Sequence, residues 1–394
     1  MKPIAVMVEN SRAYGRSMIE GIAAYAQERR GWTLRPLTVA EAFTSKLDTF
    51  NGVIARIAND RLANRLIQSG LPIVDTFCQR IRPGVAGVDS NHADIARKAR
   101  TFLQSRGFQH LAYCGIPGAA FSKQREAAFA EADTHIYSYV GRNIHPIDES
   151  QFYDERIDHI PDVDSLAEWV HSLPKPVAIF CCNDLRAIQL QQVALGCGLR
   201  VPQDVALLGV DNDTILCSFA MVPISSIDPN AFKVGYAAAR VLRTMMERSV
   251  APKTHPVHHV PVGGLIERRS TEFMPIDPPW LGEVLLHIER NMRRPIGASE
   301  IFALAGRSST TVESVFRHKL GTSVQSYIGA AKLEYARKLI ANPALRISEI
   351  GVLCGFASPQ YFCRAFATRF GLSPRAFRHH LTARTIINAK TATD

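Results

Sequence analysis

Polar side chains directly follow several short apolar runs in the first 270 residues of this 394-residue chain. Carboxylates and amides dominate the set, Lys is scarce, and no phosphate-binding loop accompanies it. Asp and Asn can bridge neighbouring hydroxyl groups through paired hydrogen bonds, and Arg donates in a fixed fork. This chemistry suits a small polyol better than a nucleotide. The residues are Asn10, Arg12, Asp75, Asn183, Asp184, Asp211 and Asp228.

Some carboxylates also have a purely structural interpretation. Asp184 can cap a helix that begins at Leu185, because its side chain can accept from unpaired backbone N–H groups there. Asp75, and Asp89 farther along the chain, can be turn residues. The sequence leaves both the structural and the ligand-binding interpretation open for each of them.

Arg125 and Asp211 also have two interpretations each. Arg125 lies in a helical pattern, where its guanidinium is either solvated or turned toward a cleft as a hydrogen-bonding fork. Asp211 stands in a turn-prone Asp-Asn-Asp sequence, but it directly follows the buried run 205–210, which favours a ligand contact.

These side chains must be positioned by alternating strands and helices. Segments with helical spacing, such as residues 16–26, separate short β-branched runs, which predicts a mostly parallel sheet covered by helices on both faces. Ligands of such sheets lie beyond the carboxyl ends of the strands. The expected strands are 4–8, 53–57, 72–74, 111–114, 177–182 and 205–210.

Several motifs in this region carry a family resemblance. They are Gly21-Ile22-x-x-Tyr25-Ala26, Phe180-x-x-Asn183-Asp184, Val201-Pro202-x-Asp204-Val205-Ala206-x-x-Gly209-x-Asp211, Ser225-Ser226-Ile227 and Glu267-Arg268-Arg269-Ser270-Thr271. On these motifs residues 3–271 resemble LacI-type repressors and type I periplasmic binding proteins. The resemblance implies a two-lobed α/β body, dimeric, whose lobes close on a carbohydrate.

By this resemblance Asn10, Arg125, Asn183 and Asp211 match effector contacts. Together with the polar residues that follow strands, they define the expected effector site. Its members are Asn10, Arg12, Asp75, Asp89, Arg125, Asn183, Asp184, Asp211 and Asp228.

The carboxyl-terminal part of the chain contains an internal repeat. Ser299-Glu300-Ile301-x-x-Leu304-x-Gly306 returns as Ser348-Glu349-Ile350-x-x-Leu353-x-Gly355. In each copy a helical pattern meets a Gly, and a second helical pattern with Arg and Phe follows, which indicates one helix-turn-helix unit used twice.

Charge separates this repeat from the preceding body. From residue 276 onward there are 16 Lys and Arg against 8 Asp and Glu, a balance of +8 within a whole-chain net charge of +10. A basic domain on a nearly neutral body is typical of DNA binding, because phosphate neutralisation dominates affinity. The alternative is a helical bundle duplicated only for packing.

Residues 281–380 resemble the AraC-type DNA-binding domain. The second copy carries the match: Ile347-x-Glu349-Ile350-x-x-x-Cys354-Gly355-Phe356-x-Ser358-x-x-Tyr361-Phe362-x-Arg364-x-Phe366 and then Gly371-x-Ser373-Pro374-x-x-Phe377-Arg378. The resemblance implies seven helices, with recognition helices near 308–319 and 358–369. The expected DNA contacts are Ser308, Thr310, Glu313, Ser314, Arg317, Ser358, Gln360, Tyr361, Arg364 and Arg369.

Individual side chains of this domain suggest different roles. Arg364 can grip guanine at two points, although a phosphate contact is the alternative. Gln360 can pair with adenine and Glu313 can accept from cytosine, unless they cap helices or face solvent. Phe316, Phe362 and Phe366 are expected in the core. The side chains expected on phosphates are Arg317, Lys319, Arg369, Arg375 and Arg378.

One helix between the two units sets their expected separation. Residues 323–342 show uninterrupted helical periodicity ended by Asn342-Pro343, and twenty helical residues span about 30 Å. Two recognition helices that enter successive major grooves on one face of B-DNA lie roughly 34 Å apart. A stiff helix of nearly this length can therefore set the distance between the two helix-turn-helix units.

The sequence gives little support for a redox site, a metal site or a membrane segment. The eight cysteines lack C-x-x-C spacing, which suits a reducing cytoplasm. His255, His258 and His259 fit an exposed edge strand better than a metal site. The amino terminus is too briefly apolar for a signal peptide or a membrane span. We therefore expect no metal, no cofactor, no catalytic group and no membrane partner.

The order of the two domains resembles that of bacterial regulators of xylose operons. It implies a cytoplasmic, dimeric transcription factor that binds xylose or a related pentose and activates sugar genes. DNA with direct-repeat half-sites, read in the major groove, and RNA polymerase are the expected partners. The alternatives are a repressor of the same build and a carbohydrate-processing enzyme with a DNA-binding appendage.

The expected domain boundaries follow from both resemblances. Residues 1–270 form the sensor, 271–280 a linker with several prolines, and 281–384 the DNA-binding domain. Within it the helix-turn-helix units span about 299–320 and 348–370.

Overall fold

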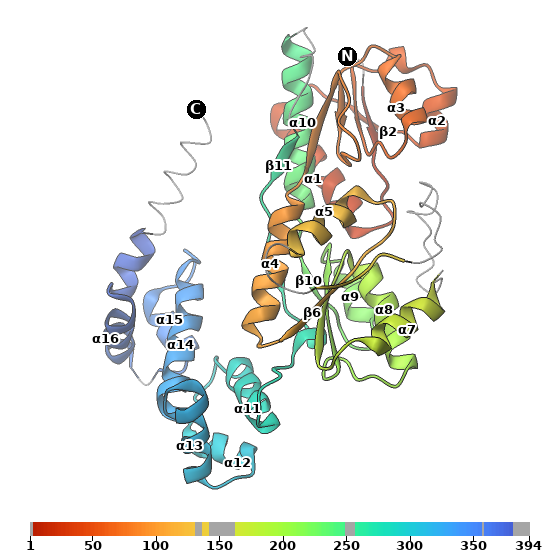
Figure 1. Ribbon diagram of the computed structural model, residues 1–394. Coiled ribbons are helices and arrows are strands. Elements are labelled where there is room, and N and C mark those ends of the chain that lie inside the picture. Colours follow the sequence, from red (N-terminus) through yellow and green to blue (C-terminus); the bar gives the residue numbers. More distant parts are fainter. Residues whose placement is uncertain (1–2, 131–135, 142–161, 249–256, 357, 381–394) are drawn as a thin grey trace. The chain divides into compact units, whose positions relative to one another are not determined.

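The computed structural model describes residues 3–130, 136–141, 162–248, 257–356 and 358–380 (Figure 1). The chain forms two compact units, Met1–Phe273 and Met274–Asp394. The boundary between them falls within the stretch expected as a linker. We call the first unit the sensor body and the second the helical unit.

The first lobe of the sensor body contains a six-stranded sheet in which all neighbouring strands are parallel. Its strands, in spatial order, are β11 (His258–Val260), β5 (Val85–Ser90), β4 (Ile73–Asp75), β3 (Gly52–Ala55), β1 (Ile4–Met7) and β2 (Leu34–Pro36). The helices of this lobe are α1 (Ala13–Arg29), α2 (Val39–Thr44), α3 (Asp60–Ile67) and α10 (Ala231–Arg248), with a 3₁₀ turn at Leu47–Thr49.

Both faces of this sheet are buried. Ile4 and Val6 share a core with residues of α1 and α10, whereas Ala5 and Met7 share a core with residues of α2 and α3. This alternation follows from the two-residue period of a strand. Helices α1 and α10 approach so closely that a Cβ at Gly235 would lie 1.9 Å from the Met18 carbonyl oxygen.

The second lobe repeats this plan. Its six-stranded sheet is parallel except for the antiparallel pair β10 and β12. The strands, in spatial order, are β12 (Leu265–Ile266), β10 (Ser225–Ile227), β9 (Val205–Val210), β8 (Val177–Cys181), β6 (His110–Cys114) and β7 (Tyr137–Tyr139). The helices are α4 (His92–Ser105), α5 (Ala120–Phe129), α7 (Val163–Ser172), α8 (Asp184–Gly196) and α9 (Thr214–Phe219), with a 3₁₀ turn at Arg269–Thr271.

The helical unit has the helix order expected from the repeat. Its helices are α11 (Pro279–Arg290), α12 (Ala298–Ala305), α13 (Ser309–Leu320), α14 (Val324–Ile340), α15 (Ile347–Leu353) and α16 (Pro359–Phe370), followed by helical residues 374–380. Phe316 lies in one core, and Phe362 and Phe366 lie in a second core, all fully buried as expected. Each helix-turn-helix turns at a glycine with positive φ, Gly306 or Gly355.

The connecting helix α14 is shorter than the sequence indicated. It has 17 residues, because Ser323 serves as its N-cap and the helix ends at Ile340. At 1.5 Å per residue it spans about 26 Å. The expected length of about 30 Å was therefore too long.

Candidate effector and nucleic-acid sites

Asp211 is the centre of the candidate effector site. It follows β9 directly and has a φ of 112°, a strained value for a residue other than glycine. Desolvation raises its pKa to about 6, while the guanidinium groups of Arg125, Arg56 and Arg12 act in the opposite direction. Guanidinium groups from both lobes therefore lie close enough to Asp211 to act on its carboxylate.

Arg56 also acts on Asp211, although it is not among the residues expected from the sequence. Its guanidinium lies over the rings of Phe77 and Tyr14, 4.4 and 5.1 Å from their centroids. The sequence contained a signal for Arg56, because it directly follows β3, which ends at Ala55. The expected strand ran to Ile57 and so hid it.

Aromatic rings and a buried acid–imidazole pair extend the site. The ring centroid of Phe121 lies 6.3 Å from those of both Phe77 and His92. His92 Nε2 lies 3.2 Å from Asp89 Oδ2, and burial lowers the pKa of His92 although Asp89 opposes the shift. Asp89 itself lies inside β5, so the turn interpretation of Asp89 was wrong. Aromatic walls with a few polar groups are typical of small-molecule sites.

Arg125 supplies a hydrogen-bond donor to this site. The side chain comes from the second turn of α5, is buried, donates through Nη1 to the Cys182 carbonyl oxygen, and lies 5.1 Å from the Phe121 centroid. Its Nε is buried and has no hydrogen-bond partner among the described residues. Since buried donors are almost always paired, a ligand oxygen is a suitable acceptor for Nε.

Asp184 has a structural role that differs from the expected cap. Asn183 is the N-cap of α8 and accepts from the Arg186 N–H at 2.8 Å, so the helix begins at Asp184 rather than at Leu185. The carboxylate of Asp184 accepts from the Asp213 N–H at 2.9 Å and from Ser226 Oγ at 2.6 Å. Burial raises its pKa to about 8. Asp184 therefore holds the turn that carries Asp211.

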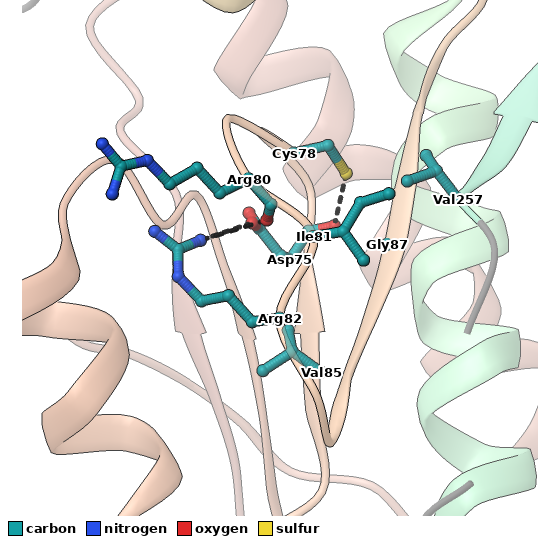
Figure 2. Close-up of a pocket in the computed structure, with 8 residues that line it drawn as sticks. All are labelled: Asp75, Cys78, Arg80, Ile81, Arg82, Val85, Gly87 and Val257. Atoms are coloured by element: carbon teal, nitrogen blue, oxygen red, sulfur yellow. Dashed lines mark hydrogen bonds and ion pairs between the residues drawn. The ribbon is translucent and has the colours of Figure 1, made fainter. Parts of the chain in front are cut away.

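Asp75 lines a separate small pocket at the end of β4 (Figure 2). Its Oδ1 accepts from the backbone N–H groups of Phe77 and Ile57 at 2.9 and 3.1 Å, and Arg82 lies 3.8 Å from Oδ2. Burial raises the pKa of Asp75 to about 6. The pocket has an empty volume of about 230 Å³, open to solvent, and also contacts Cys78.

The remaining expected effector residues make local contacts or act on Asp211. Asn10 is exposed, and its carbonyl oxygen accepts from Arg16. Arg12 is the N-cap residue of α1, and its side chain is close enough to influence the pKa of Asp211. Asp228 accepts from the Asn230 N–H at 2.7 Å, a turn-forming bond.

The two recognition helices of the helical unit start in the same way. Ser308 and Ser358 are N-caps that accept from the Thr311 and Tyr361 N–H groups at 3.2 and 3.1 Å. Both serines therefore fix the helix starts. The exposed side chains that follow are Thr310, Ser314 and Arg317 on α13, and Gln360, Tyr361, Arg364 and Arg369 on α16.

Two side chains of this unit differ from their expected positions. Glu313 is half-buried, and its Oε2 has no hydrogen-bond partner among the described residues. Arg378 donates through Nε to the Ile340 carbonyl oxygen at 3.0 Å, which satisfies the end of α14. Arg378 therefore supports the end of α14, and the phosphate contact expected for it stays a prediction.

The described part of the chain contains no group of three or more His, Cys, Asp or Glu side chains arranged to hold a metal ion. His255 lies outside the described residues, and His258 and His259 are exposed on the edge strand β11. All eight cysteines are free. Among the described helices, none has the length and apolar character needed to cross a bilayer.

Two parts of the chain match different family models. Residues 100–271 match the model of the periplasmic binding protein-like domain, and residues 302–380 match that of a helix-turn-helix domain. The expected combination of an α/β sensor and a helix-turn-helix unit is thereby confirmed.

Full-length similarity extends to named regulators. The xylose operon regulatory protein of Escherichia coli (strain K12) is 26% identical over 392 residues, which cover 95% of this chain and 96% of that protein. The protein of the same name from Haemophilus influenzae is 24% identical over 394 residues, covering 95% and 97%. The solved structure of the xylose-binding transcription activator XylR is 25% identical, with a TM-score of 0.58, and the match covers 96% of this chain and 97% of that chain.

A pH titration tests the environment assigned to Asp184. Because its folded pKa is about 8, the native state keeps a proton that the unfolded chain releases near pH 4. The free energy of unfolding should therefore fall as pH rises from 6 to 8, by at most about 1.4 kcal/mol per pH unit, and level off above pH 8. The Asp184→Asn variant should have a smaller slope. Equal slopes for both proteins in chemical unfolding would refute the assigned protonation.

Proposed function

Because the chain joins a periplasmic binding protein-like domain to an AraC-type helix-turn-helix domain and aligns with xylose operon regulatory proteins over nearly its whole length, we propose that it is a xylose-responsive transcriptional regulator. The sensor body binds the sugar, and the helical unit binds DNA. The arrangement around Asp211, with cations from both lobes, carries the proposal for the sensor.

The site chemistry supports a neutral polyol as effector. Asp211 and Asp89 accept from sugar hydroxyls, and Arg125 donates through its buried Nε. The Phe77 and Phe121 rings cover an apolar face of the sugar ring. Arg56 is stacked between Phe77 and Tyr14, so its guanidinium is held in place before a ligand arrives. Asn10, Arg12 and Asn183 form the rim of this site.

The helical unit provides two readers for DNA. We assign base contacts to Arg364 and Gln360 on α16 and to Thr310 and Ser314 on α13, which insert into successive major grooves over direct-repeat half-sites. The side chains of Arg317, Lys319, Arg369 and Arg375 are exposed and hold phosphates.

The regulator acts in the cytoplasm as a homodimer that works with RNA polymerase and activates transcription. Helix α9 and the turn after it offer an apolar face for a second copy, because Ile215, Phe219 and Met221 are 64, 88 and 78% exposed. Apolar side chains this exposed on a neighbouring helix and turn are typical of a surface that is covered in the assembled protein. A repressor of the same build is distinguished from an activator by the sign of the response of a reporter gene to xylose.

Calorimetry with D-xylose tests the sensor assignment. The wild-type protein is expected to bind, and Asp211→Ala is expected to lower affinity about 10- to 100-fold, because a hydrogen bond to a charged group contributes about 1.5–3 kcal/mol. Asp204→Ala is the matched control, since this carboxylate pairs with Arg200 on the surface of the same lobe. Equal losses in the two variants, or binding of another aldose in place of xylose, would contradict the assignment. Conversion of the sugar, followed by NMR, would favour an enzyme.

Operator binding tests the role of Arg364. Arg364→Ala is expected to weaken specific DNA binding by about 1–3 kcal/mol and to relax sequence preference at one position, while xylose affinity stays unchanged. Arg375→Ala is the comparison, because loss of a phosphate contact weakens specific and non-specific binding alike and reduces the salt slope by about 1. Fluorescence anisotropy over a salt series separates the two. An unchanged sequence preference in Arg364→Ala would refute base reading.

A further inference from the structure

Helices α1 and α5 begin beside the candidate effector site without a capping side chain of their own. The N-cap residues are Arg12 and Ala119, and neither forms a side-chain capping bond. By contrast, α3, α4, α8 and α9 are capped by Asn59, Asn91, Asn183 and Asp213. The first N–H groups of a helix have no partner within it, so α1 and α5 need acceptors from elsewhere.

Asp213 of the second lobe supplies the acceptor for α1 of the first. Its Oδ2 accepts from the Ala13 N–H at 3.2 Å and lies 3.8 Å from the Arg16 guanidinium. Its Oδ1 accepts from the first N–H groups of α9, on Ile215 and Leu216, both at 3.2 Å. One buried carboxylate therefore caps two helices that belong to different lobes.

Gln79 makes the opposite connection. It follows β4 of the first lobe, and its Oε1 accepts from the Ala120 N–H at 2.9 Å. Ala120 is the first residue of α5 in the second lobe. Each lobe thus provides one hydrogen-bond acceptor for the first N–H group of a helix in the other lobe.

We propose that Asp213 and Gln79 are positioning residues that hold the sensor body closed by reciprocal helix capping across the two lobes. Separation of the lobes leaves both helix starts without an acceptor, so each cap shifts the balance toward the closed form. Ala13 adjoins Arg12, and Ala120 adjoins Phe121, so the two caps lie beside effector-site residues. A sugar that orders these residues strengthens the caps.

The Asp213 cap also affects the proposed dimer surface. Asp213 holds the first turn of α9, the helix that carries Ile215 and Phe219. Burial raises the pKa of the Cys217 thiol on the same helix, and the nearby Asp184 carboxylate acts in the same direction. The carboxylate of Asp213 therefore affects both the closure of the two lobes and the orientation of α9. This consequence rests on the proposed function, whereas reciprocal capping does not.

Distance measurement between the lobes in the absence of sugar tests the inference independently of the effector. Spin labels on exposed Gln68 of the first lobe and Glu168 of the second report the closed and open populations of the full chain. Asp213→Asn retains one oxygen to cap α9 but replaces the Ala13 acceptor with an NH₂ group. It is expected to lower the closed-to-open ratio about 5- to 10-fold. Gln79→Ala should act in the same direction, and the double variant should multiply the two effects.

Asp204→Asn is the control, because it removes the same charge from the same lobe without touching the other lobe. Unchanged distance distributions in Asp213→Asn and Gln79→Ala, with melting temperatures equal to that of the wild type, would overturn the inference. A second readout is the D-xylose dissociation rate, expected to rise about 5- to 10-fold in both variants with little change in the association rate. If xylose does not bind the wild type, the proposed effector fails, and the distance measurement still decides the capping.

Discussion

The sensor depends on how its buried carboxylates at the carboxyl ends of the strands are satisfied. A charged group without partners is costly in a protein interior, so each one is either bonded to backbone N–H groups, paired with a cation or kept protonated. Asp184 is kept protonated, because burial raises its pKa to about 8. Its bonds to the Asp213 N–H and Ser226 Oγ fix the turn after β9. That turn holds Asp211 at a positive φ, and guanidinium groups from both lobes oppose the rise in the pKa of its carboxylate. The strained conformation of Asp211 is thus supported by the neighbouring carboxyl group of Asp184.

Much of the architecture could be predicted from the sequence. The alternation of β-branched runs and helical segments indicated the parallel sheets, and the internal repeat indicated both helix-turn-helix units with their buried phenylalanines. These features are encoded locally, by strand and helix periods and by glycines at the turns. Asp211 and Arg125 also followed from local position, as polar residues after a strand and on a helix beside the expected cleft.

Other features depend on distant contacts and could not be read locally. For Asp184 the sequence left a helix cap and a ligand contact both open, because nothing near it in the sequence indicates the bond to Ser226, 42 residues away. Arg56 was hidden because the expected strand ended at Ile57, two residues beyond the observed end of β3. The bond of Arg378 to the end of α14 joins residues 38 positions apart. The capping of α1 by Asp213 joins residues 200 positions apart. Such contacts exist only once two lobes have folded and met.

Coupling between the sensor body and the helical unit has one thermodynamic requirement. A sugar can change the state of the DNA-binding unit only if it binds one arrangement of the protein more tightly than the other, and DNA must then change sugar affinity by the same factor. The most direct measurement is the dissociation constant of D-xylose for the free protein and for the protein saturated with a DNA fragment that it has selected from a random pool. The account requires the two constants to differ, by the factor with which xylose changes DNA affinity. Identical constants for free and DNA-bound protein would contradict it.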